Sequence, residues 1–156
     1  MTREEVIERI LEIAVAEIGT AEEPPGGNAG PVLRYGGKAG APWCCWYITW
    51  CVRLATGQWP CGMKRQTGGT GTLITAARHT QAVRRTYDKP QPGDIAWRHR
   101  RNSAGAIVGG HVGIVESVNK KRITTIEGNS GDAVRRRVRN RDSWLYFIDP
   151  LNGVMP

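Results

Sequence analysis

The chain has 156 residues, of which 40% are hydrophobic and 23% charged. This composition is ordinary for a soluble globular protein, and the length suffices for one domain that buries most of its apolar surface without disulfides or metals. No apolar run approaches the length of a membrane span. We therefore expect one domain over residues 1–156, with its core at about 3–150, that acts as a monomer and does not insert into a membrane.

The net charge is +8, from 22 basic and 14 acidic residues. Much of the excess lies late in the chain, in RHRR (98–101) and AVRRRVRNR (133–141), where five arginines occupy seven positions. Such a surface favours an anionic partner, which includes nucleic acid, an anionic membrane and an anionic cell-wall polymer. A solvated face that only keeps the protein soluble explains the charge equally well.

The first predicted element is an amphipathic helix. Thr2-x-x-Glu5 fits a capping box, and an apolar stripe at helical spacing continues to Ile18, so the helix should end near Gly19. Acidic residues along this stretch and the lack of a small-residue cleavage site exclude a secretory signal. We expect synthesis in the cytoplasm.

Residues 21–42 are rich in Gly and Pro and predict an ordered loop, with a short helix around Val32–Tyr35. From Cys44 to about Ala55 the chain is apolar nearly all round, which is typical of a buried helix, and Gly57 provides its stop. A third, more polar helix is predicted over Thr72–Arg84.

The pattern changes to strands after Pro90. The turn Pro92-Gly93-Asp94 leads into a strand that starts at Ile95. The β-branched runs 111–118 and 122–127 are separated by three residues and predict a hairpin, and 144–148 predicts a last strand. Helices followed by antiparallel strands define the α+β class.

The four cysteines allow three interpretations. Two disulfides are disfavoured without a secretion signal. A zinc site is disfavoured because adjacent Cys44 and Cys45 do not match the usual spacing of a zinc knuckle, so we expect no metal and no cofactor. The third interpretation is one nucleophile accompanied by buried thiols, and Cys51, two turns after Cys44, should be buried.

Cys44 is the candidate nucleophile because it lies at the predicted start of the buried helix. Unpaired N–H groups and the positive end of the helix dipole favour a thiolate there. Cys45 lies about 100° further round the helix and cannot point the same way.

His111 is the candidate base, because it starts a predicted strand after two glycines, whereas His79 and His99 are expected to face solvent. Hairpin pairing places Glu127 near His111, where it can orient the imidazole, and Asn129 follows in a turn. Glu127 could instead be a strand-end carboxylate bonded only to that turn.

Five segments, in order, resemble the motifs of the CHAP family, the cysteine- and histidine-dependent amidohydrolases/peptidases of papain-like fold that act on peptidoglycan. The resemblance covers about residues 17–150, and its segments are EIGTAEEP, YGGKAGAPWCCWYITWC, PQPGDIAW, GGHVGIVES and TTIEGNSG. It implies a Cys44 nucleophile, a His111 base, and Glu127 and Asn129 as the acid and the asparagine of the site. Cys45 and Trp46 depart from the small residues that many relatives have after the nucleophile.

The sequence thus predicts a peptidoglycan hydrolase that cuts an amide bond, as an endopeptidase or an N-acetylmuramoyl-L-alanine amidase of phage endolysin type. Trp43 and Gly110 are expected to wall the substrate groove, and Arg135, Arg136 and Arg137 to contact anionic wall polymers. The protein would act at the cell wall after holin-type release. The alternatives are a non-catalytic wall-binding or tail-assembly module of the same fold and a basic nucleic-acid-binding protein, although no nucleic-acid-binding motif accompanies the arginines.

Overall fold

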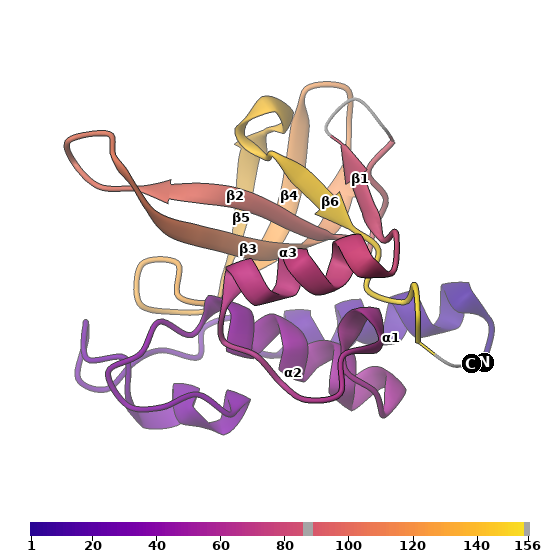
Figure 1. Cartoon of the computed structure of the whole chain (residues 1–156). Helices are drawn as coiled ribbons and strands as arrows, with labels where there is room; N and C mark the ends of the chain where they lie inside the picture. The colour runs from indigo at the N-terminus through magenta and orange to yellow at the C-terminus, as the bar shows by residue number, and fades with distance from the viewer. Residues whose placement is uncertain (86–88, 155–156) are drawn as a thin grey trace.

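The computed structural model describes residues 1–85 and 89–154, with the side chain of residue 85 excepted, and within these ranges helices pack against one face of an antiparallel sheet (Figure 1). The helices are α1 (Arg3–Ala16), α2 (Cys44–Thr56) and α3 (Thr70–His79), with 3-10 turns η1 (Gly30–Tyr35), η2 (Pro60–Gly62) and η3 (Arg141–Ser143). The strands are β1 (Val83–Arg85), β2 (Ile95–Arg101), β3 (Ile107–Val118), β4 (Arg122–Glu127), β5 (Arg135–Asn140) and β6 (Tyr146–Ile148). The predicted α+β class is confirmed.

The ends of the first two helices follow the local signals in the sequence. The Glu5 N–H donates to the Thr2 hydroxyl at 3.2 Å, and the Thr2 N–H donates to the Glu5 carboxylate at 2.6 Å, so the capping box is present. Helix α2 ends at Gly57, whose φ of +75° is left-handed and whose N–H bonds the Arg53 carbonyl.

The predicted helix over Thr72–Arg84 is too long at its C-terminal end. Helix α3 stops at His79, and Gln81 adopts a left-handed φ of +57°. The N–H of Ala82 bonds the Ala77 carbonyl at 2.8 Å, which closes a Schellman motif. The chain then turns into β1, which pairs with β6. The sequence did not predict this helix end because Gln81 occupies the left-handed position that glycine usually takes.

The sheet has the strand order β1-β6-β2-β3-β4-β5, and every neighbouring pair is antiparallel. The predicted hairpin of β3 and β4 is confirmed, and the Asn119 side chain accepts backbone N–H groups inside its turn. Strand β3 begins at Ile107, earlier than predicted, because β2 and β3 form a long hairpin. His111 therefore lies inside β3, opposite Arg98 of β2.

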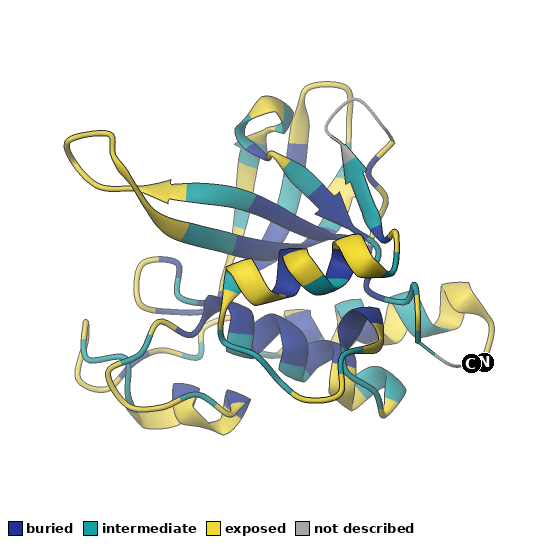
Figure 2. Ribbon diagram, in the orientation of Figure 1, coloured by how far each residue is buried: buried dark blue, intermediate teal, exposed yellow. Residues whose placement is uncertain are grey.

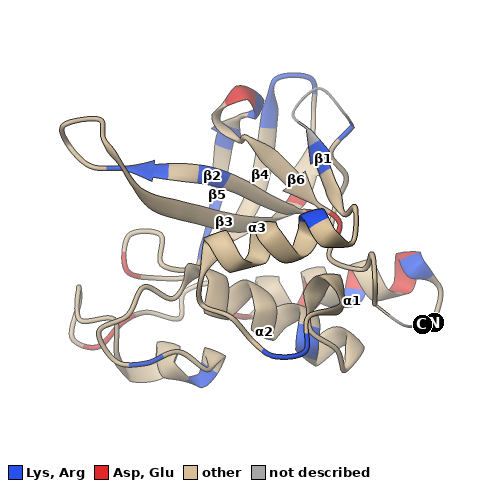
Figure 3. Cartoon of the chain, viewed as in Figure 1, with Lys and Arg blue, Asp and Glu red and all other residues tan. Residues whose placement is uncertain are grey.

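Strand β5 was not expected, because its sequence RRRVRN was interpreted only as a basic cluster. It pairs with β4 along its whole length and forms one edge of the sheet. Charged side chains are common on edge strands, where they discourage pairing with other chains. Figure 3 shows the resulting basic residues along β5 and at the end of β2.

The two faces of the sheet have different roles. The main core lies between the helices and one face, and Figure 2 shows α2 largely buried up to its last turn. The opposite face carries a smaller apolar cluster that includes Trp144 and Phe147. Cross-strand partners share a face, so His111 and Arg98 also lie on this second face, beyond the small cluster. Within the described ranges, no helix is both long and apolar enough to cross a membrane.

Candidate active site

Cys44 is the first residue of α2, and contacts of the preceding residue hold that helix start in place. The Trp43 indole N–H donates to the Glu22 carboxylate at 2.7 Å, and its ring stacks on Tyr35 with 5.7 Å between ring centres. Cys44 is buried, with 6% of its surface exposed. The sulfur of Cys44 lies near the first N–H groups of α2. Because these groups have no acceptor within the helix, they favour negative charge on the sulfur.

The His111 imidazole lies between a thiol and a carboxylate. On one side the ring faces the Cys44 side chain, which interacts with it and lines the same cavity. On the other side, Nε2 lies 2.7 Å from Oε1 of Glu127. Because Nε2 of His111 is hydrogen-bonded to Glu127, Nδ1 is the ring nitrogen that remains available to the thiol. Side chains from α2, β3 and β4 therefore meet in series, and the predicted proximity of Glu127 and His111 is confirmed.

Gly113 makes this meeting possible. The register pairs Ile114 with Ile126, so Glu127 lies across from Gly113 on the neighbouring strand. A Cβ atom at Gly113 would lie 2.7 Å from Cγ of Glu127, far inside a normal carbon contact. The missing side chain leaves the space through which Glu127 reaches the His111 ring.

The Glu127 carboxylate is fully buried and is held from several sides. Arg139 of β5 donates two parallel hydrogen bonds, from Nε at 2.9 Å and from Nη2 at 2.7 Å, and the Thr125 hydroxyl donates a third. Burial acts to raise the pKa of Glu127, but the bonds from Arg139, His111 and Thr125 outweigh it and lower the pKa to about 2. The carboxylate is therefore ionised at neutral pH.

The same contacts favour a protonated imidazole. Burial acts to lower the pKa of His111, but its interactions with Cys44 and Glu127 outweigh burial and raise the pKa to about 9. An imidazolium with a carboxylate on one side can stabilise a thiolate on the other.

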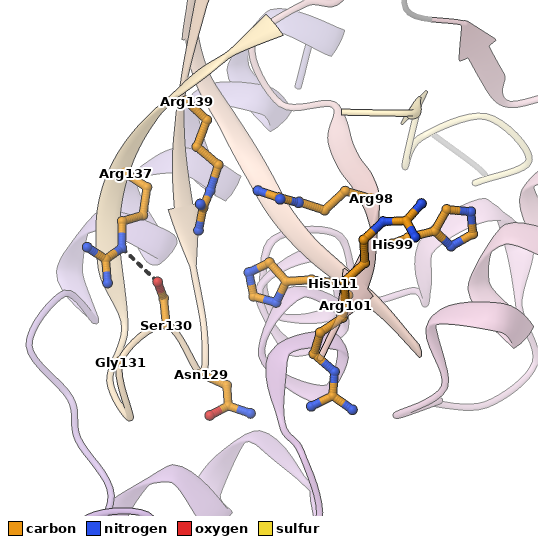
Figure 4. A pocket seen from close by; sticks show the side chains of 10 residues that line it. Arg98, His99, Arg101, His111, Asn129, Ser130, Gly131, Arg137 and Arg139 are labelled. Carbon is orange, nitrogen blue, oxygen red and sulfur yellow. Dashed lines mark hydrogen bonds between the residues drawn. The ribbon is translucent and has the colours of Figure 1, made fainter. Parts of the chain in front are cut away.

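Two cavities meet at this histidine. One, of about 330 Å³, is lined by Cys44 and by short residues that include Gly69 and Gly110. The other, of about 390 Å³, is strongly basic and is drawn in Figure 4. His111 and Asn129 line both cavities. Asn129 has a left-handed φ of +55°, in the turn that follows β4.

The structure thus brings Cys44, His111, Glu127, Asn129 and Gly110 together. Trp43 is the exception. Its side chain is only 1% exposed and packs in the core, because it must reach Glu22 and Tyr35 to set the start of α2. The expectation that Trp43 walls the groove is therefore replaced by a structural position behind the nucleophile.

The remaining cysteines behave as buried thiols. All four cysteines are free, and Cys45 and Cys51 are fully buried, which raises the pKa of both thiols. Burial also raises the pKa of Cys61 to about 12. The expectation that Cys45 and Cys51 are buried is confirmed.

The other two histidines lie away from this series. His79 is exposed on α3, whereas His99 is half-buried and its ring contacts the edge of Trp97. Among residues 1–85 and 89–154, no group of three or more His, Cys, Asp and Glu side chains could hold a metal ion.

Sequence reasoning missed Gly113, Thr125 and Arg139 as parts of this site. Thr125 and Gly113 could have been found from the hairpin register, since both fall on the face of Glu127. Arg139 could not be separated from its arginine neighbours until β5 was recognised as a strand. Once it is, alternation places Arg135, Arg137 and Arg139 on one face and Arg136 on the other.

The predicted basic cluster is accordingly not one surface. Arg136 forms a two-pronged ion pair with Glu116, at 2.7 and 2.8 Å. Arg135 donates to the backbone carbonyls of Ser130 and Gly131, and Arg137 donates to the Ser130 hydroxyl at 2.7 Å. Only part of the charge of this cluster is free for a partner.

A thiol at a helix start, followed in series by an imidazole and a third polar side chain from an antiparallel sheet, is similar to the Cys-His-Asn arrangement of papain-like proteases, with a carboxylate here in place of the asparagine. The CHAP domain model matches residues 36–129, which is more than half of the chain. The chain belongs to the CHAP domain family, and the predicted family and fold are confirmed.

Solved structures support the same fold. The chain is similar to Ly7917 (TM-score 0.57, 20% identity) and to Ly7917 "with the hydrolyzing product of MDP" (TM-score 0.57, 21% identity). Each comparison covers 92% of this chain and 62% of the other, so the chain spans less than two thirds of the length of Ly7917. No curated protein matches the chain.

Proposed function

We propose that this protein hydrolyses an amide bond of bacterial peptidoglycan with Cys44 as the nucleophile. The observation that carries the proposal is the series Cys44–His111–Glu127 at the wall of an open cavity. Each member has the environment that its role requires. The thiol lies at a helix start, the imidazole has a raised pKa, and the carboxylate is ionised.

In the acylation step, the Cys44 thiol passes its proton to Nδ1 of His111, and the thiolate attacks the carbonyl carbon of the amide. Backbone N–H groups at the start of α2 donate to the oxyanion that forms. His111 then gives its proton to the departing nitrogen, the C–N bond breaks, and an acyl-thioester remains on Cys44. Glu127 stabilises the imidazolium throughout.

In the second step, His111 takes a proton from water, and the hydroxide attacks the thioester carbon. The C–S bond breaks, the carboxylic acid product leaves, and the proton returns to Cys44. Arg139 and Thr125 keep the Glu127 carboxylate oriented in both steps, which makes them positioning residues. Asn129 lines both cavities and contacts the bound substrate, and Gly110 leaves open space beside the ring.

Peptidoglycan is proposed as the substrate on two grounds. The chain belongs to the CHAP family, and the resemblance of its motifs to that family implies cysteine- and histidine-dependent cleavage of peptidoglycan. The similar protein Ly7917 has a crystal structure "with the hydrolyzing product of MDP". We propose action at the cell wall, as an endolysin-type enzyme that works as a monomer. Endopeptidase and N-acetylmuramoyl-L-alanine amidase activities both fit a thiol mechanism.

The test is digestion of purified cell walls, with mass spectrometry of the soluble fragments. Wild-type protein should release fragments with new amino and carboxyl ends, and the position of those ends identifies the bond. Cys44→Ser should bind walls and release none. If the wild type bound walls without releasing fragments, the protein would be a wall-binding module. Retention on DNA at moderate salt without any wall activity would favour the nucleic-acid alternative.

A further inference from the structure

The basic cavity beside His111 is chemically unlike the cavity that holds Cys44. Five arginines line it, namely Arg98, Arg100, Arg101, Arg137 and Arg139, and among the described residues no carboxylate does. Figure 4 shows Arg98 and Arg139 extending toward each other from opposite sides of the cavity, with the His111 ring beside them. So much positive charge in a concave site favours an anionic ligand group.

Arg139 and Arg98 differ in what balances their charge. Arg139 uses both arms of its guanidinium on Glu127. Arg98 has no ion pair with any carboxylate in the described part of the chain, and its guanidinium carbon lies 5.8 Å from the ring centre of Trp144. Burial and the neighbouring Arg139 lower the pKa of Arg98, although the Glu127 carboxylate acts to raise it. A half-buried cation that has no directly paired anion is costly, and a ligand carboxylate or phosphate would relieve that cost.

Arg137 faces the same cavity from β5. Its Nε donates to the Ser130 hydroxyl at 2.7 Å, which fixes the plane of the guanidinium. Within the described contacts, its two Nη groups have no bonded acceptor, so they are available to a ligand. A guanidinium held by one hydrogen bond loses less freedom when it binds an anion.

We propose that Arg98 and Arg137, which line the same cavity, bind carboxylate groups of the substrate on residues that flank the amide bond cut at Cys44. The inference rests on the proposed function and specifies its substrate class as acidic wall peptides. The carboxylate belongs to the substrate itself because the basic cavity and the Cys44 cavity share His111 and Asn129. An anionic group bound in one cavity is therefore within a residue or two of an amide bound in the other. A phosphate on a separate wall polymer would not be connected to that amide in this way.

The test compares hydrolysis of one soluble muropeptide in two forms, with its carboxylates free or converted to primary amides. Wild-type protein should prefer the free form in kcat/KM by about 10- to 100-fold, the usual effect of losing a hydrogen bond to a charged group. Arg98→Gln and Arg137→Gln should each bring the ratio toward one. Arg136→Gln is the matched control, because Arg136 is on the same strand but points to the other face and pairs with Glu116.

The outcomes separate the two proposals. Equal hydrolysis of both forms by the wild type would overturn the carboxylate site and leave amide hydrolysis intact. If Arg98→Gln hydrolysed both forms normally but bound walls weakly, the anion would be a wall-polymer phosphate and the proposal would be wrong. Hydrolysis of neither form would overturn the proposed function together with this inference. Thermal unfolding of each variant checks that loss of the Trp144 contact has not unfolded the protein.

Discussion

Gly113→Ala is the sharpest test of how the carboxylate reaches the histidine. An added methyl carbon would lie 2.7 Å from Cγ of Glu127 and 3.2 Å from Cβ of Thr125. Carbon atoms approach comfortably to about 3.5–4.0 Å, so the Glu127 side chain would have to move by about 1 Å. Gly113 does not have a left-handed φ, so alanine fits the backbone and the effect comes from these contacts, of which the one with Glu127 is the shortest.

The expected consequence is a loss of rate without a loss of the fold. A displacement of about 1 Å in an aligned catalytic series costs about 100-fold in kcat/KM. The displaced carboxylate should also support the imidazolium less well, so the pH at which activity declines on the alkaline side should fall.

The assay is the rate of fragment release from a soluble muropeptide over a range of pH, with circular dichroism to verify folding. Gly71→Ala is the matched control, because a Cβ at Gly71 meets nothing within 4 Å and alanine suits its helix. A Gly113→Ala variant with wild-type rate and an unchanged pH profile would refute the proposed path of Glu127 to His111.

Three further predictions follow from the same geometry. Cys44→Ser should fold and be nearly inactive, whereas Cys45→Ala should stay active and lose roughly 1 kcal/mol of stability. The rate of wall lysis by the two variants checks this prediction. The opposite pattern would mean that the nucleophile is misassigned. Because the pKa of His111 is raised from 6.5 to about 9, its charged form contributes stability that is complete below pH 6.5 and lost as the pH rises through about 9. Activity should decline in the same window, and Glu127→Gln should move that decline to lower pH in a pH-rate profile; no movement would argue against the pairing. Gln81→Gly should raise the melting temperature, since it relieves about 1 kcal/mol of strain at a left-handed φ, and a lower melting temperature would contradict the assigned helix end.

The sequence predicted most reliably what short-range signals encode. The Thr2–Glu5 cap, the Gly57 stop and the turn at Asn119 each depend on a few neighbouring residues, and each is present. The candidate site also followed from local elements, since the start of the buried helix located Cys44 and the hairpin with its turn at Asn119 placed Glu127 near His111. Alternation of Val, Ile and Thr made the central strands visible.

The failures have a common physical cause, which is dependence on partners far along the chain. Strand β5 contains almost no apolar residue, and only its pairing with β4 makes it a strand. Arg139 therefore looked like one surface arginine among five. Likewise, Trp43 resembled a groove residue until Glu22, distant in sequence, was seen to accept its N–H.

The contacts of Trp43 and Arg139 also bear on how short a working version of this domain can be. The segment that matches the family model, residues 36–129, contains Cys44, His111 and Glu127. It lacks both Glu22, which anchors the helix start behind the nucleophile, and Arg139, which holds the acid from the edge strand. A fragment trimmed to that segment would keep every reacting group and lose both contacts that align them. Because β6 pairs with β1 and β2 inside the sheet, fusions and truncations should retain α1 through β6.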